Sequence, residues 1–158
     1  MIDLRLKKLI KECDKHLERI KHASVKMAVF MPLDASRYAQ LTDDEVEHID
    51  QYLYRFSKLQ DVIGEKLFVL VLEFLKEENI KSKPFIDILN RLEQLELLED
   101  KNVWLELRKI RNTIAHQYED EPEQASVALN AIYAAKRTLE TIYLALKSRY
   151  VAISDSIE

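Results

Sequence analysis

The chain has 158 residues, which is enough for one domain with a substantial hydrophobic core. It contains one glycine, three prolines and one cysteine, a composition that disfavours tightly turned sheets and excludes an intrachain disulfide or a cysteine-based metal cluster. The net charge of −4 is not the strongly basic balance of a protein that coats nucleic acid, although it leaves room for a local basic cleft.

No targeting or membrane segment stands out in the sequence. The N-terminal residues carry charges every few positions and lack the apolar stretch of a signal peptide. The longest apolar run, LFVLVLEFL at 67–75, includes a glutamate and is too short to cross a bilayer. We therefore expect a soluble, cytoplasmic protein.

Apolar residues at alternating spacings of three and four predict a first helix over 2–29, followed by a loop that contains Pro32. Cys13 lies on the inward seam of this helix, so we expect a buried thiol that acts as a small apolar side chain.

A second helix is predicted from the capping box of Thr42 and Glu45 to about residue 79. After Ile63 it is apolar on more than one side, which indicates a central place in a bundle or contact with a second protomer. Gly64 lies inside this helix, where it costs about 1 kcal/mol relative to alanine. Close approach of a neighbouring helix would explain it, and a kink is the alternative.

Three further helices are predicted from capping and proline signals. Pro84, Asp100 and Pro122 stand where these helices begin, and their expected ranges are 84–98, 101–118 and 122–150. Every connection is short. The sequence thus predicts an all-α, up-down bundle of four to five helices as one domain over 1–150, with a flexible tail over 151–158.

The fourth predicted helix separates its residues into faces on a helical wheel. The core stripe is Val103, Leu107, Ile110, Ile114 and Tyr118. The opposite side holds Leu105, Asn112 and His116, with Arg108 at its edge, and the flank between them holds Trp104, Arg111 and Ala115. His116 therefore points away from the core, either into solvent or toward another surface such as a second protomer. Tyr118 could turn toward His116 if the helix frays near its end.

The segment Arg111-Asn112-x-x-x-His116-x-Tyr118 resembles the Arg-x-x-x-x-His-x-Tyr motif of the HepT-type toxins, members of the HEPN superfamily. In that family the motif also lies near the end of a late helix in an all-α bundle of about this length. The second-helix segment IDQYLYRFSKLQDVIGEKLF is similar to the corresponding helix of HepT-like proteins. The resemblance extends from the first helix through the fifth.

The resemblance implies a HEPN-like homodimer in which two copies of the motif face one another across a cleft. It implies a metal-independent endoribonuclease, without a cofactor, that is the toxin of a type VII (HEPN/MNT) toxin–antitoxin system. Its partner would be an MntA-type minimal nucleotidyltransferase antitoxin, which transfers AMP to the motif tyrosine, here Tyr118.

The residue types suit metal-free cleavage of RNA by the ribose 2′-hydroxyl. Imidazole exchanges protons near neutral pH, so His116 is the expected proton-transfer residue. The guanidinium of Arg111 is always cationic and can hold two phosphoryl oxygens. Asn112 is one turn before His116 and is expected to support the ring or the phosphate. AMP on Tyr118 would place a bulky anion beside Arg111 and compete with RNA.

Other interpretations stay open on sequence alone. The same fold serves as a non-catalytic partner or substrate-binding subunit of a nucleotidyltransferase, or as a helical dimer scaffold. Arg55 and Lys58 could form a basic rim for RNA, but ordinary charge pairs with Asp50 or Asp61 on a solvated face are the stronger expectation. Phe56 is expected in the core. The other histidines, His16, His22 and His48, lack the spacing of metal ligands.

Overall fold

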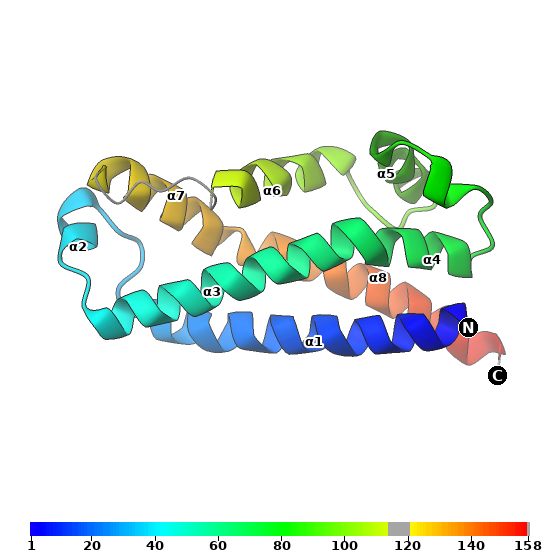
Figure 1. The fold of residues 1–158 in the computed structure, drawn as a ribbon, viewed down its shortest axis with the longest axis horizontal. Coiled ribbons are helices and arrows are strands. Elements are labelled where there is room, and N and C mark those ends of the chain that lie inside the picture. The colour runs from blue at the N-terminus through cyan, green and yellow to red at the C-terminus, as the bar shows by residue number, and fades with distance from the viewer. Residues whose placement is uncertain (114–120, 158) are drawn as a thin grey trace.

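The computed structural model describes residues 1–113 and 121–157. Within these two ranges the chain is helical throughout its regular elements and contains no strand, which confirms the all-α class. Figure 1 shows a bundle of long helices that lie roughly along one axis, with both termini at the same end. No helix of the described part combines the length and the apolar character needed to cross a membrane.

Two long elements form the base of the bundle. Helix α1 (Ile2–Met27) packs along α3 (Asp43–Val62), which continues through the π-helical turn η1 (Ile63–Leu67) into α4 (Phe68–Phe74). The predicted capping box is confirmed, because the Thr42 hydroxyl accepts from the Glu45 N–H and the Glu45 carboxylate accepts from the Thr42 N–H. Cys13 is fully buried, and burial raises its pKa to about 12, as expected of a structural thiol.

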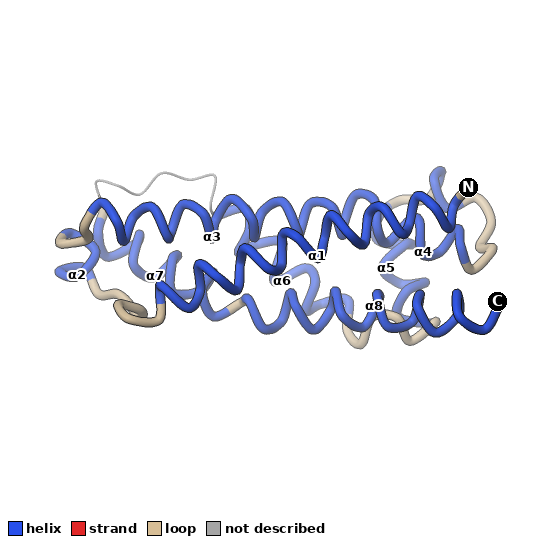
Figure 2. Tube along the Cα trace, turned by 90° about the horizontal axis from the view of Figure 1, so that it is seen from below, coloured by secondary structure: helices blue, strands red, loops and turns tan. Residues whose placement is uncertain are grey.

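The other elements cover this base, as Figures 1 and 2 show from two directions. In chain order they are α2 (Ala35–Ala39), the 3₁₀ turn η2 (Ile80–Ser82), α5 (Phe85–Gln94), α6 (Lys101–Thr113), α7 (Pro122–Ala134) and α8 (Lys136–Ile157). The predicted helix over 122–150 is divided at Ala135. Helix α8 then continues to Ile157, through most of the segment that the sequence predicts as a flexible tail.

Two helices end earlier than predicted. After α4, Lys76 adopts a left-handed conformation (φ 65°), and the Glu77 N–H donates to the Leu72 carbonyl at 3.0 Å. After α5, Glu96 does the same (φ 60°), and the Leu97 N–H donates to the Leu92 carbonyl at 2.9 Å. Both are Schellman caps, which usually carry glycine at the left-handed position. Because lysine and glutamate stand there instead, the sequence gives no stop signal.

The only glycine lies where α6 crosses the π-helical turn. A Cβ on Gly64 would lie 3.0 Å from Cζ2 of Trp104, a contact so tight that the indole would have to shift by a few tenths of an ångström to accept it. The prediction that a neighbouring helix approaches Gly64 is therefore confirmed. Over the same residues the helix widens into the π-helical turn η1.

The core face of α6 differs from the predicted one. Trp104 is buried, with 2% of its surface exposed, and its ring meets Phe68 edge to face at a centroid distance of 4.8 Å. Val103, predicted in the core stripe, is 38% exposed. Its assignment to the core and that of Trp104 to the flank are wrong. The helical wheel assigned the core face to the side with more aliphatic residues. In the structure the Trp104 indole is buried instead, because Gly64 has no side chain and leaves space for it. Leu107 is buried as predicted.

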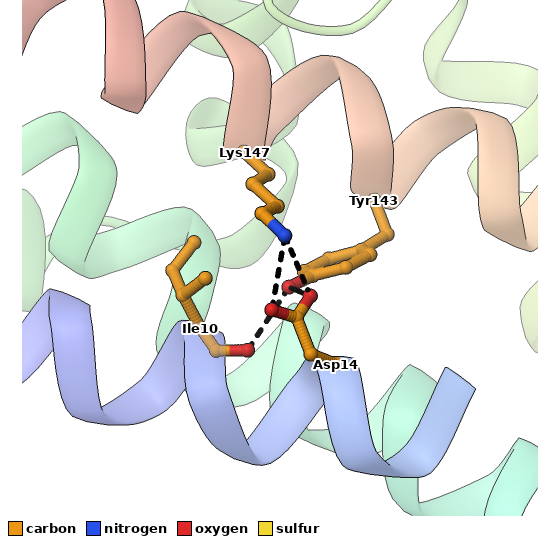
Figure 3. A network of polar contacts seen from close by, with 4 residues as sticks. All are labelled: Ile10, Asp14, Tyr143 and Lys147. Atoms are coloured by element: carbon orange, nitrogen blue, oxygen red, sulfur yellow. Dashed lines mark hydrogen bonds and ion pairs between the residues drawn. The ribbon is translucent and has the colours of Figure 1, made fainter. Parts of the chain in front are cut away.

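A polar network fastens α8 to α1, as Figure 3 shows. The Tyr143 hydroxyl lies 2.6 Å from Oδ1 of Asp14 and 3.0 Å from the Ile10 carbonyl oxygen. Lys147 Nζ donates to both carboxylate oxygens of Asp14 at 3.0 and 2.9 Å. Burial, followed by the hydrogen bond to Asp14, raises the pKa of Tyr143, so the phenol stays protonated. These contacts hold Tyr143 and Lys147 of α8 beside Ile10 and Asp14 of α1.

Candidate functional site

Only part of the motif lies within the described residues, which end at Thr113 and resume at Glu121. Arg111 and Asn112 belong to the last turn of α6. His116, Tyr118 and the remaining core-stripe candidate Ile114 lie outside the described residues. The expected approach of Arg111 to His116 and to Tyr118 therefore stays a prediction. The described part of the site is the surroundings of Arg111.

Arg111 forms a side-on ion pair with Asp61 of α3. Nε lies 3.1 Å from Oδ1 and Nη2 lies 3.1 Å from Oδ2, so the guanidinium and the carboxylate are parallel and doubly hydrogen-bonded. The side chains are 28% and 39% exposed, at the edge of the bundle rather than inside it. The hydrogen bonds from Arg111 to Asp61 raise the arginine pKa further above its already high ordinary value. Arg111 is thus fixed in direction, and Nη1 takes no part in the pair.

Asp61 is the site residue that sequence reasoning missed. The sequence indicated surface pairs between Asp61 and Arg55 or Lys58, but its carboxylate bonds Arg111 instead. Arg55 donates from Nη1 to Nδ1 of His16 at 3.1 Å, and both Arg55 and Lys58 lie over the exposed ring of Tyr54. The two partners of the true pair are 50 positions apart. Only the register between α3 and α6 brings them together, and no local pattern encodes it.

Arg111 lines a cleft of about 640 Å³ between the α3–η1 segment and the pair α5 and α6. Helix α6 supplies Trp104, Arg108 and Asn112 to its walls, and Arg108 lies over the ring of Phe85 with Cζ 5.1 Å from the centroid. The opposite wall comes from α3 and η1 and includes Gln60, Asp61, Gly64 and Glu65. The cleft therefore combines cations, carboxylates and aromatic rings around one concave surface. We call it the Arg111 cleft.

Two buried polar atoms beside the Arg111 cleft are without hydrogen-bond partners among the described residues. They are Oε1 of Gln60, in a side chain that is 3% exposed, and Nε1 of Trp104. The third such atom of the described chain, Nε2 of His16, lies elsewhere. An unpaired buried polar group costs about 1–3 kcal/mol, and such groups are uncommon in native proteins. Their concentration here distinguishes this cleft from the ordinary surface of the bundle.

Asn112 is exposed and reaches a second, shallower hollow of about 500 Å³ on the outer face of α6. Leu105 and Arg108 also line this hollow, so three of the four residues that the wheel placed on the outer side or at its edge share it; the fourth, His116, lies outside the described residues. Tyr52 and Phe56 of α3 are fully buried in the core. The expected core position of Phe56 is confirmed.

Comparison of the chain with models of protein families, with curated proteins and with solved structures finds no match.

Proposed function

We propose that the chain is a metal-independent endoribonuclease, the toxin of a HEPN/MNT toxin–antitoxin system. The observation that carries this proposal is the guanidinium of Arg111, held in a cleft by Asp61 in the last turn of α6, five positions before His116 in the sequence. An arginine fixed through Nε and Nη2 can present Nη1 to a phosphate without first losing side-chain freedom. The motif resemblance supplies the partner of this arginine in the reaction.

The proposed reaction needs only the substrate and two kinds of side chain. His116 accepts the proton of the ribose 2′-hydroxyl, the 2′-oxygen bonds to phosphorus, and the bond from phosphorus to the 5′-oxygen breaks. A protonated imidazole, which the second His116 of a homodimer can provide, returns a proton to the leaving 5′-oxygen. Arg111 balances the charge that builds on the phosphoryl oxygens. The products are a 2′,3′-cyclic phosphate and a 5′-hydroxyl end.

The proposal includes regulation through Tyr118, which the motif resemblance implies. A nucleotidyltransferase antitoxin would attach AMP to Tyr118, with release of pyrophosphate from ATP, and the new phosphate would compete with RNA for Arg111. Asn112 is the supporting residue, one turn before His116. In this proposal the working unit is a homodimer, because one protomer offers one motif histidine.

The test is an assay of RNA cleavage by the purified protein in the presence of a metal chelator. Mass spectrometry identifies the chemical groups at the ends of the RNA products. We expect cyclic phosphate ends from the wild type, and at least a hundredfold slower cleavage by His116→Ala and by Arg111→Ala. The matched controls are His22→Ala and Arg149→Ala, which remove exposed side chains of the same types far from the motif in sequence. Cleavage by the His116→Ala protein at the wild-type rate would overturn the proposal.

A second candidate is a non-catalytic partner of a nucleotidyltransferase. It is favoured by the fact that Arg111 already gives two hydrogen bonds to Asp61, an arrangement that also serves to pack α6 against α3. The two candidates differ in one simple experiment. Expression of this chain without any partner should arrest growth if it is the ribonuclease, and the His116→Ala variant should relieve the arrest. A mere partner subunit arrests nothing.

A further inference from the structure

A further hollow, of about 790 Å³ and distinct from the one at Asn112, adjoins the Arg111 cleft on the side of α1. Its rim carries four cations from three elements, and its floor is apolar: the cations are Arg5, Lys8, Lys66 and Lys81, and the floor includes Leu9, Val69, Leu70, Ile80 and Ile88. We call it the basic groove. In Figure 1, α1 runs along one side of the segment formed by α3, η1 and α4, and α6 lies on the other side. Glu65, Val69 and Ile88 line both.

Most of the rim cations have no acidic partner among the residues that the structure describes. Within the described ranges, no carboxylate oxygen lies within 4.0 Å of the charged nitrogens of Arg5, Lys8 or Lys66. Lys81 makes only a long contact, 3.8 Å, with Glu73. Elsewhere on the bundle, cations such as Arg91 and Lys147 are bonded to carboxylates. Unpaired cations that converge on a concave surface repel one another, and an anion that lies among them relieves the repulsion.

The two hollows together form a basic surface on an acidic protein. Seven basic and three acidic side chains line them, a local charge of about +4, whereas the whole chain carries −4. The acidic groups are Glu12, Glu65 and Asp61, and the last of these is already bonded to Arg111. The overall charge, which disfavours RNA as a ligand, therefore does not describe this face.

We propose that the basic groove binds the backbone of a single RNA strand whose scissile phosphate lies in the Arg111 cleft. This inference rests on the proposed function. It adds that the protein binds an extended single strand of RNA rather than only the few nucleotides next to the scissile phosphate. Cations along the rim suit successive phosphates, and the apolar floor suits the faces of unpaired bases. A duplex hides its base faces, so the apolar floor would gain nothing from it.

The test uses RNA binding by a protein that cannot cut. In the His116→Ala background, we compare Lys8→Ala/Lys66→Ala with Lys26→Ala/Arg137→Ala, which removes the same charge from exposed positions outside both hollows. Affinity is measured by fluorescence anisotropy for a long single strand and for a trinucleotide, each over a range of salt. All four positions are exposed, so folding is expected to persist, and circular dichroism verifies it.

For the long strand, the groove variant should lower the slope of log affinity against log salt by about 1.4, since each single-strand phosphate contact contributes roughly 0.7. The control pair should leave that slope within error, and the trinucleotide should bind both variants alike. Equal losses for both pairs, or a loss that does not depend on RNA length, would overturn the groove assignment. If the wild type cleaves RNA while the groove variant binds normally, the groove fails and the nuclease stands. If no RNA binds or is cut, both proposals fail.

Discussion

The edge of the Trp104 indole rests on Gly64, with Cζ2 3.0 Å from the place a Cβ would occupy. This contact joins α6 to the α3–η1 segment, and we infer that it sets the register between them. Asp61 lies three residues before Gly64, and Arg111 lies seven residues, or two turns, after Trp104. We therefore expect the ion pair of the candidate site to depend on the packing of an aromatic ring on the only glycine of the sequence.

We expect Gly64→Ala to destabilise the protein even though alanine is the better helix former. The added methyl group meets a ring that is 2% exposed and already packed against Phe68, so the ring has little room to move. Overpacking of this kind costs about 2 kcal/mol, and the helix preference of alanine offsets about 1 kcal/mol. Chemical denaturation should show a net loss of about 1 kcal/mol in the free energy of unfolding.

The matched background for this experiment is Trp104→Leu. With the indole gone, the methyl group at position 64 has space, so Gly64→Ala should stabilise the Trp104→Leu protein. A double-mutant cycle thus predicts a reversal of sign. If alanine at position 64 has the same effect in both backgrounds, the contact does not determine the register.

Asp61→Asn should separate the positioning of Arg111 from the stability of the bundle. The amide keeps the size of the carboxylate but offers one oxygen and no charge, so the side-on pair loses its geometry. If Arg111 holds the scissile phosphate, kcat should fall at least tenfold with little change in KM. The free energy of unfolding should change by less than about 1 kcal/mol, because the pair is partly exposed.

Asp50→Asn is the control, since it removes an exposed carboxylate from the same helix. Asp61 would have no positioning role if Asp61→Asn retained wild-type kinetics while Arg111→Ala was inactive. Loss of stability without loss of kcat would assign the pair to packing alone.

The sequence predicts this architecture well where the signal is local and poorly where it depends on contacts between helices. The capping box at Thr42 and the seam around Cys13 arise from spacing within one helix, and both are confirmed. The ends of α4 and α5 were missed because Lys76 and Glu96 occupy left-handed positions without the glycine that marks them. The burial of Trp104 and the partner of Arg111 depend on the register of α6 against α3, which periodicity does not contain.

Tyr143→Phe tests the network that joins α8 to α1. The change removes the hydroxyl that lies between Asp14 and the Ile10 carbonyl but keeps the buried ring. Lys147 still bonds the carboxylate, so no charge is left without a partner. We expect a loss of about 1.5–3 kcal/mol in the free energy of unfolding, the usual range for a hydrogen bond to a charged group. Tyr54→Phe, at an exposed ring, should change it by less than about 0.5 kcal/mol, and equal effects of the two changes would contradict the assignment.

We expect the protein to become less stable as the pH falls below 6.5, because the folded state disfavours protonation of His16. Arg55 has no acceptor, so its Nη1 must donate to Nδ1 of His16, and that nitrogen must be unprotonated. Burial, and then the charge of Arg55, lower the pKa of His16 below its ordinary 6.5, although Glu12, with Oε1 3.6 Å from Nε2, acts in the opposite direction. Below pH 6.5 the unfolded chain therefore binds a proton that the folded chain resists.

The unfolded state binds more protons than the folded state between the pKa of His16 in the folded protein and 6.5. In this pH range the free energy of unfolding therefore increases with pH, and it decreases as the pH falls from 6.5 toward the folded-state pKa of His16. The slope from this one residue is at most about 1.4 kcal/mol per pH unit. Denaturation at a series of pH values between about 5 and 7 should show a flatter profile for His16→Gln than for the wild type. His22→Gln, at an exposed histidine, should leave the wild-type profile unchanged. Parallel profiles for His16→Gln and the wild type would mean that His16 is protonated as easily in the folded bundle as in the unfolded chain, and the contact with Arg55 would then not hold it neutral.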